Sequence, residues 1–423
     1  MANDKQNTSP NVPNKREQSG IYSGYAERGE LRPQGNVPNL RFPEFGGEWE
    51  KAYLNNITKI SKGAGISKEQ LSDTGIPCIL YGELYTKYKS EVITDVYSKT
   101  NIDNTNLITS RANDVIIPCS GETAIEIATA RCVLASDILL GGDLNVIRLN
   151  GHDGRFFAYQ LNGKRKIDIA KVAQGVSVVH LYGEHLKKIK VAYPSIEEQT
   201  KIAELLSLID RRISTQNKII EQLQSLIKGI CNKLLYAENG KQVRLADMLT
   251  ERTERTRENN QYEVLSSTIK GIFSQREYFS KDIASENNIG YKVIRLYDIV
   301  LSPQNLWMGN INYNEKYEIG IVSPSYKIFS INPEYDKKFV AAMLKTHRAL
   351  YNYLLVSEQG ASIVRRNLNM EAFEQLVFKM PPYNKQREIG KTLSVLQTRL
   401  ELESKIKLYY EQQKKYLLTE MFI

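Results

Sequence analysis

Two short motifs in this sequence come closest to catalytic chemistry. Met380-Pro-Pro-Tyr383 contains the Pro-Pro-Tyr of loops that hold an amino group for methyl transfer, where Asp or Asn must come first. That residue hydrogen-bonds the amino group, which the thioether of Met380 cannot do. Pro333-Glu-Tyr-Asp-Lys-Lys338 places an acid beside lysine, as in metal-dependent nucleases, but the upstream acidic partner is missing. Neither motif therefore predicts an active site.

Motifs for cofactors and metals are missing as well. Gly163-Lys164-Arg165 is not a phosphate-binding loop, because Ala158 stands where such a loop needs its first glycine. The four cysteines have no paired spacing and the four histidines are scattered singly. Neither a disulfide framework nor a zinc site is indicated. We therefore expect no catalytic residue, no metal and no cofactor in this chain.

The composition favours an acidic partner. With 423 residues the chain should form two or more domains. Its net charge of +9 and isoelectric point near 9.0 favour nucleic acid, although a basic protein without a polyanionic partner would look the same. No apolar run approaches the roughly 18 residues of a membrane span, and the polar N-terminus lacks a signal peptide. A reducing, cytoplasmic setting is expected.

Loops that combine glycine, aromatic and basic residues are the candidate nucleic-acid contacts. Arg and Lys can neutralise phosphates, while amides, Arg and carboxylates can read base edges in the major groove. In the first half of the chain these candidates are Lys62, Tyr81, Gly82, Glu83, Tyr85, Lys87, Ser120, Glu122, Lys164, Arg165 and Lys166. In the second half they are Ser266, Ser267, Lys270, Gln275, Arg276, Gln304, Asn305, Trp307, Arg365, Arg366 and Asn367. For each residue the alternative is a solvent-facing loop position without a ligand.

The elements that would position these loops are repeated within the chain. Pro194 and Gln199 open one long apolar-periodic segment, and Pro381 and Gln386 open another with the same spacing. Upstream, Gln-Gly-Val-Ser at 174–177 is echoed by Gln-Gly-Ala-Ser at 359–362. A repeat of this length implies two equivalent modules related by an internal two-fold axis.

Each repeated segment predicts a long helix. Ser195 with Glu198 would form a capping box at the start of the first one. Spacings of four and three continue through Ile202, Leu206, Ile209, Ile213, Gln216, Ile220, Leu223, Ile227, Ile230 and Leu234, a coiled-coil seam with one polar position. The second seam is clean through Ile389, Leu393, Leu396 and Leu400. The helices are expected to pair antiparallel, with the globular domains at opposite ends; ordinary amphipathic helices of a bundle are the alternative.

The remaining sequence predicts two mixed α/β domains. The expected organisation is a disordered leader (1–38), a first domain (39–193), a first helix (194–240), a second domain (241–380) and a second helix (381–423). Strands are expected at 76–81, 114–118 and 145–149, with Tyr297–Ser302 as the counterpart of Asn113–Pro118. Helices are expected near 154–161, 185–188 and 339–353.

Together these features resemble the specificity (S) subunit of type I restriction–modification enzymes. The segments that carry the resemblance are Pro38–Trp49, Gly75–Tyr85, the Gln-Gly-x-Ser element and Pro194-Ser-Ile-Glu-Glu-Gln-Thr-Lys-Ile-Ala203. Asn384-Lys385 departs from the Glu-Glu that is usual in that family, so a capping box on the second helix is in doubt.

The resemblance implies a non-catalytic, cytoplasmic DNA-recognition subunit. Each mixed domain would be a target recognition domain that reads one half of an asymmetric bipartite sequence. The paired helices would be the spacer and would dock two methyltransferase (M) subunits, which bring S-adenosylmethionine, while restriction (R) subunits bring ATP and Mg. A helix of about 40 residues spans about 60 Å, enough for half-sites about 34 Å apart. Two rival functions stay open: a self-sufficient DNA adenine methyltransferase, and a coiled-coil scaffold that does not bind DNA.

Overall fold

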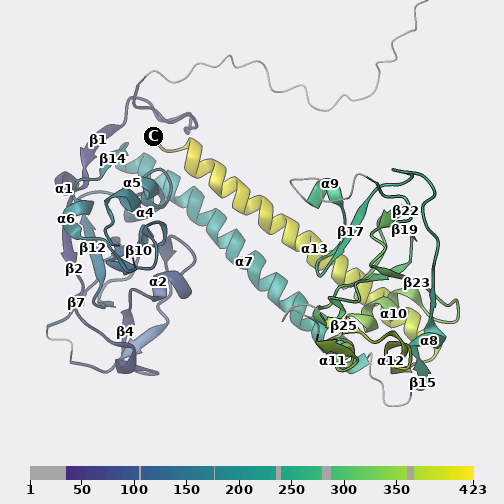
Figure 1. Ribbon diagram of the computed structural model, residues 1–423. Helices are drawn as coiled ribbons and strands as arrows, with labels where there is room; N and C mark the ends of the chain where they lie inside the picture. Colours follow the sequence, from purple (N-terminus) through teal and green to yellow (C-terminus); the bar gives the residue numbers. More distant parts are fainter. Residues whose placement is uncertain (1–34, 104–105, 176, 235–239, 279–286, 360–365) are drawn as a thin grey trace, which may run out of the picture. The chain divides into compact units, whose positions relative to one another are not determined.

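The computed structural model describes residues 35–103, 106–175, 177–234, 240–278, 287–359 and 366–423 (Figure 1). The leader expected at 1–38 lies almost entirely outside the described residues. Two compact units divide the chain, one formed by Met1–Asp210 with Gln412–Ile423 and the other by Arg211–Glu411. Each unit contains one mixed domain and the adjoining parts of two long helices. No helix in the described ranges has the length and apolar character needed to cross a membrane.

The first domain is built on two five-stranded sheets. One has the order β2 (Thr58–Lys62), β12 (Leu144–Leu149), β8 (Asp114–Pro118), β10 (Arg131–Val133) and β5 (Val92–Ile93). The other has the order β3 (Leu71–Ser72), β6 (Ser98–Thr100), β4 (Ile76–Ile79), β11 (Leu139–Leu140) and β7 (Ile108–Thr109). Two small pairs join β1 (Glu50–Tyr53) to β14 (Lys190–Tyr193) and β9 (Ser120–Gly121) to β13 (Val179–His180). The helices are α1 (Leu54–Ile57), α2 (Glu83–Thr86), α3 (Ala124–Ile127), α4 (Gly154–Asn162), α5 (Lys166–Val172), α6 (Gly183–Leu186) and the short η1 (Lys68–Gln70).

The second domain has a smaller sheet on a similar plan. Its four-stranded sheet has the order β16 (Leu249–Glu251), β23 (Lys327–Ile331), β20 (Ile299–Leu301) and β21 (Ile311–Tyr313). Paired strands are β15 (Lys241–Arg244) with β26 (Val377–Met380), β17 (Leu265–Thr268) with β18 (Gly271–Ser274), β19 (Lys292–Arg295) with β22 (Ile319–Val322), and β24 (Ser357–Gln359) with β25 (Arg366–Leu368). The helices are α8 (Leu245–Met248), α9 (Gln275–Tyr278), α10 (Lys337–Leu344), α11 (His347–Leu355), α12 (Met370–Glu374) and η2 (Leu306–Met308).

The local predictions differ from the structure at two helices. The segment 339–353 is not one helix, because Thr346 caps a new one: its hydroxyl accepts a hydrogen bond from the Ala349 amide at 3.2 Å. The helix expected at 185–188 begins earlier and is α6. The strand expected at 114–118 and the helix expected near 154–161 are confirmed as β8 and α4.

A matched tight turn before β8 and β20 confirms the internal repeat. Asn113 has a φ of 80° and Tyr297 a φ of 73°, a left-handed conformation that few residues adopt. After each comes a buried aspartate whose Oδ2 accepts a backbone N–H: Asp114 from Arg111 at 2.8 Å, and Asp298 from Arg295 at 2.9 Å. In each case the carboxylate closes the turn by accepting the backbone N–H of the residue three positions earlier.

The two repeated segments form the long helices α7 (Ile196–Leu234) and α13 (Tyr383–Glu420), which contact each other (Figure 1). In the second unit, Gln216 donates to the Glu403 carbonyl at 3.2 Å. Arg212 stacks on Tyr410 there at 5.7 Å from the ring centroid. In the first unit Lys414 is ion-paired with Asp210 at 2.6 Å. As the residue number increases along α7, the residue number of the contacting partner on α13 decreases. The expected antiparallel pairing is therefore confirmed.

The seam side chains vary in burial along these helices. Ile202, Leu206, Ile209, Gln216, Ile389 and Leu393 are buried, whereas Ile213, Ile220, Leu223, Ile227, Ile230, Leu396 and Leu400 are half-buried. The side chain of Leu234 lies outside the described residues. Gln216, expected as the polar position, also hydrogen-bonds the buried carboxylate of Glu403. A buried polar pair of this kind can fix the register of two helices.

The capping box expected at Ser195 does not form. The Ser195 hydroxyl accepts a long hydrogen bond from the Glu198 amide at 3.5 Å, but the Glu198 carboxylate binds Arg41 instead, at 2.7 Å from Nη2. Arg41 is too far along the chain for helix capping rules to reveal it. The start of α7 is thus held by a tertiary ion pair.

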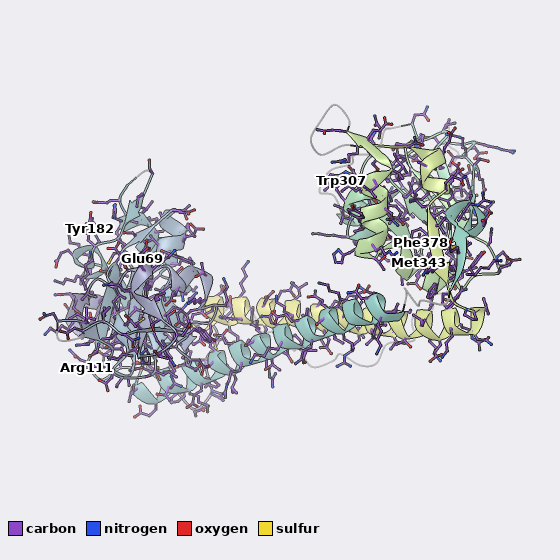
Figure 2. All side chains as sticks on the ribbon, turned by 90° about the horizontal axis from the view of Figure 1, so that it is seen from below. Glu69, Arg111, Tyr182, Trp307, Met343 and Phe378 are labelled. Atoms are coloured by element: carbon purple, nitrogen blue, oxygen red, sulfur yellow. The ribbon has the colours of Figure 1, made fainter. Side chains whose placement is uncertain are left out.

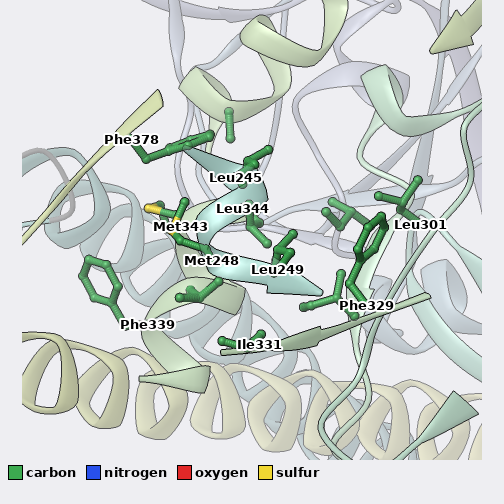
Figure 3. Packing of buried hydrophobic residues seen from close by; sticks show 14 of the residues in the cluster. Leu245, Met248, Leu249, Leu301, Phe329, Ile331, Phe339, Met343, Leu344 and Phe378 are labelled. Carbon is green, nitrogen blue, oxygen red and sulfur yellow. The ribbon is translucent and has the colours of Figure 1, made fainter. Parts of the chain in front are cut away.

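The core of the second domain extends onto the long helices. Figure 3 shows its centre, where α8, β23 and α10 bring together Met248, Ile331 and Phe339. The same cluster includes Ile389 and Leu393 of α13, with Ile227 of α7 packed against it. Burial of such side chains stabilises by about 1.5–3 kcal/mol each, so the domain and the helix segments of this unit should unfold together.

Candidate nucleic-acid interface

Two buried glutamines attach the domains to the long helices. Gln199 donates from Nε2 to the Pro194 carbonyl at 2.8 Å, and its Oε1 accepts the Asp153 amide at 3.1 Å. Asp153 in turn caps α4. The repeat reproduces this arrangement: Gln386 donates to the Pro381 carbonyl at 2.8 Å and accepts the Asp336 amide at 3.0 Å. This explains why the glutamine recurs in the sequence.

Replacing either glutamine by leucine should destabilise the unit that contains it. Gln199→Leu leaves a buried carbonyl and a buried amide unpaired, which costs about 2–5 kcal/mol. Gln386→Leu should have an effect of similar size on the second unit. Urea unfolding followed by circular dichroism measures the loss. Gln222→Leu, at an exposed position of α7, is the matched control; equal losses in all three variants would contradict the role of the buried amides.

In the first domain the structure brings together Lys62 and Ser120, two of the candidate contact residues. The Lys62 ammonium lies 3.2 Å from the Asp143 carboxylate, and the Ser120 hydroxyl donates to the same carboxylate at 3.3 Å. Ser120 also lies 3.4 Å from Nδ1 of His180. The hydrogen bond to Asp143 raises the pKa of Lys62, which therefore stays cationic. The result is a small polar cluster with an exposed positive charge.

Sequence reasoning missed His180 and Tyr182 beside this cluster. Their rings stack with centroids 6.2 Å apart, and Tyr182 is 54% exposed (Figure 2). The segment His180-Leu-Tyr-Gly183 combines glycine, aromatic and basic residues, the same pattern that marks the other candidate loops. An exposed aromatic ring beside a polar cluster can contact bases or sugars.

The candidates around α2 are mostly engaged inside the domain. Glu83 is buried and accepts the Leu80 amide at 3.0 Å and the Lys87 ammonium at 2.7 Å. The Tyr85 hydroxyl donates to the Ser120 carbonyl at 3.1 Å, and burial raises the pKa of Tyr85. These contacts hold α2 in place. Glu83 and Lys87 are thus engaged within the domain, which does not support a role for them in contacting bases. Tyr81 and Glu122 are exposed and Gly82 is half-exposed.

Lys164, Arg165 and Lys166 lie at the start of α5. The Arg165 guanidinium bridges Asp168 at 3.3 Å and the carbonyl of Ile423 at 2.7 Å. Burial lowers the pKa of Lys166, whereas Lys164 is exposed. Arg165 thus ties the C-terminus to the first domain.

In the second domain the serine candidates are buried. Ser267 is 2% exposed and donates to Asn310 Oδ1 at 2.8 Å while it accepts from Asn312 at 2.7 Å. Gln275 donates to Ser266 at 3.0 Å. These residues form a polar network under the β17–β18 hairpin. Lys270, in the turn of this hairpin, is exposed, as is Arg276 after β18.

The other second-domain candidates gather around η2. Arg366 donates its amide to the Gln304 carbonyl at 3.1 Å, and its guanidinium lies 5.2 Å from the centroid of Trp307 (Figure 2). Asn305 immediately precedes η2, and Asn367 is exposed on β25. Arg365 lies outside the described residues. A guanidinium stacked on an indole is pre-oriented for phosphate or base contacts.

Nothing in this arrangement resembles a reactive centre. Within the described ranges no three His, Cys, Asp or Glu side chains are grouped so that they could hold a metal ion. Burial raises the pKa of Cys119, beside the Lys62 cluster, to about 11, so its thiol is protonated and unreactive at neutral pH. The chemistry that the two domains offer is hydrogen bonding, stacking and charge neutralisation.

Comparison with known proteins finds similarity over part of the chain. Residues 46–225 match the family of type I restriction modification DNA specificity domains. A curated relative, the specificity subunit of the type I restriction enzyme MjaVIII from Methanocaldococcus jannaschii, is 30% identical over 199 residues, which are 46% of this chain. The chain spans 43% of the length of that relative.

A solved structure has the same fold over nearly the whole chain. The S subunit of the type I restriction–modification system from M. genitalium is 16% identical, with a TM-score of 0.62. The similarity covers 92% of this chain and 99% of that one. The expected fold, two mixed domains with two long helices, is therefore confirmed.

Proposed function

We propose that this chain, which contains a type I restriction modification DNA specificity domain, is the DNA-sequence specificity subunit of a type I restriction–modification enzyme. The family match over 46–225 carries the proposal. The duplicated framework supports it, because two domains on one pair of helices can contact two places on a DNA duplex. The chain itself would be non-catalytic, and because the DNA that it recognises is genomic it would act in the cytoplasm.

The target should be asymmetric, because the two domains offer different contact groups. The first domain presents Lys62, Ser120 and Tyr182, and the second presents Arg366 on Trp307. Hydrogen-bonding groups read base edges, so unlike groups select unlike sequences. The proposed target is bipartite, with two unrelated halves and an unread gap. The boundaries 39–193 and 241–380 are proposed for the two target recognition domains.

An exposed apolar row on α13 supports a docking site for the methyltransferase subunit. Val395, Leu402 and Tyr409 follow at intervals of seven residues and are 61%, 50% and 64% exposed. Seven-residue spacing aligns side chains along one face of a helix, the pattern that another helix recognises. We assign this row to a helix of the M subunit. The M subunits would bring S-adenosylmethionine for adenine methylation, and R subunits would bring ATP and Mg.

Charges placed in this row should abolish assembly. Val395→Lys with Leu402→Lys should weaken binding of the M subunit by about 100-fold or more, because lysine would be desolvated against an apolar helix. Isothermal titration of the M subunit into the chain measures the affinity. Gln397→Lys with Ser404→Lys has the same spacing on another face of α13 and should bind normally. An equal loss of M-subunit affinity in both double variants would mean that any added charge on the helix weakens assembly, and would contradict a specific docking row.

The proposed function is tested by adenine methylation. The source genome is sequenced by a method that detects methylated adenine, with and without this gene. An asymmetric bipartite motif should lose its methylation when the gene is deleted. Retained methylation would refute the proposal. Methylation by the isolated chain with S-adenosylmethionine would instead favour the self-sufficient methyltransferase.

A further inference from the structure

A basic groove on the first domain is separate from the cluster around Lys62. It has a volume of about 1040 Å³, and its lining residues come from α1, α5 and the segment from α6 to β14. Five cationic side chains line it, Arg165, Lys171, Lys187, Lys188 and Lys190, against two carboxylates, Asp168 and Glu184. The groove therefore carries a surplus of positive charge.

The surplus charge faces solvent. Arg165 is paired with Asp168 at 3.3 Å, and Lys187 with Glu184 at 2.6 Å. Lys171 from α5 and Lys188 beside β14 are exposed, and within the described ranges neither has an ion-pair partner. Lys190 lies over the Tyr53 ring at 5.4 Å from its centroid. Two neutralised pairs and three lysines without a carboxylate partner among the described residues make a site for an anion rather than for a cation or a neutral ligand.

The second domain provides an internal comparison. Its α12 and β26 repeat α6 and β14, and β26 pairs with β15 as β14 pairs with β1. The equivalent positions hold Glu374, Gln375 and Val377 where the first domain has Lys187, Lys188 and Lys190. The framework thus folds without these lysines. They give the first domain positive charge at positions where the second domain has none.

This difference between the two domains helps to decide whether the groove binds a protein or DNA. A subunit that docks twice on the repeated framework would meet lysines at one site and a glutamate at the other. DNA carries phosphate along its whole length, and each recognition domain can contact it to a different extent. The observations therefore favour a phosphodiester backbone as the occupant.

The position of the groove relates it to the proposed base-reading cluster. Asn55 and Asn56 of α1 line the groove, and α1 leads directly into β2, which ends at Lys62. Five residues of strand span about 16 Å, roughly five base pairs along a duplex at about 3.4 Å each. The groove therefore lies within reach of DNA that continues past the cluster.

We propose that this groove binds the phosphate backbone of DNA flanking the half-site read by the first domain. The proposal rests on the function proposed above. Lys171 and Lys188 neutralise phosphates, and Asn55 and Asn56 can donate hydrogen bonds to phosphate oxygens. The groove adds affinity without sequence preference, and it does so on one side of the target only. The flanking contact therefore makes the footprint asymmetric.

Duplex length tests this proposal. The complex of the full chain with its M subunits binds three duplexes of identical target sequence: one trimmed at both ends, one extended by about ten base pairs beyond the first half-site, and one extended beyond the second. The wild-type complex should bind the first extension about tenfold more tightly than the trimmed duplex. In Lys171→Ala with Lys188→Ala this advantage should vanish, and the slope of log affinity against log salt should fall by about 1–2.

Matched variants separate the possible outcomes. Lys68→Ala with Lys99→Ala removes two exposed lysines at η1 and β6 and should keep the length advantage. Glu374→Lys with Gln375→Lys should create an advantage for the second extension. Equal affinity of the wild type for all three duplexes would overturn the groove proposal while leaving the proposed function intact. Loss of M-subunit binding in the Lys171/Lys188 variant would overturn it in favour of an acidic protein partner, and failure to bind any duplex would refute the proposed function itself.

Discussion

Adding seven residues to each long helix is expected to lengthen the gap in the DNA target and to leave both half-sites unchanged. The insertions go after Asn217 in α7 and after Leu402 in α13, next to the Gln216–Glu403 contact. Seven residues extend a helix by about 10 Å, which corresponds to about three base pairs. Methylation mapping should then find the same two halves with a gap longer by about three.

The helical twist of DNA determines how much affinity is lost when the gap becomes longer. Three base pairs turn the second half-site by about a third of a helical turn, so binding should weaken although the halves are still recognised. Insertion into α7 alone is the control: it breaks the antiparallel register and should abolish methylation. A longer chain with an unchanged gap would show that the helices do not set the spacing.

Exchanging the second mixed domain is expected to change one half of the target completely. Residues 241–380 would be replaced by the corresponding domain of another specificity subunit. Gln386 Oε1 accepts the backbone N–H of Asp336, so the donor domain needs a residue other than proline at this position, and an aspartate there would also cap the helix that follows. Methylation mapping should find one half-site unchanged and the other that of the donor.

Exchange of the first domain tests whether each domain reads its own half-site. Replacing 39–193 should change the opposite half-site, and the effects of both exchanges should combine in the double exchange. An exchange that alters both halves at once would mean that base reading is shared between the domains. Loss of all methylation in a stably folded chimera would place specificity in the helices.

The sequence by itself determined the repeat, the two long helices and the resemblance to specificity subunits. Apolar spacing of four and three fixes which face of a helix is buried, and this local rule predicted α7 well. The recurring Pro-x-x-x-x-Gln was also visible in the sequence, but the sequence did not show why it recurs. Only the structure shows that Gln199 binds the backbone of Pro194 and Asp153, residues that the fold brings together.

The tertiary structure decided which polar residues are free to contact a ligand. Glu83 and Ser267 looked like loop residues, but both are buried and satisfied by partners that are distant in the sequence: Ser98 of β6 for Glu83, and Asn310 with Asn312 of β21 for Ser267. Composition and spacing cannot reveal such partners, since they come from separate strands. The same reason hid the basic groove, whose lysines are unremarkable in sequence and converge only where α5 packs beside α6 and β14.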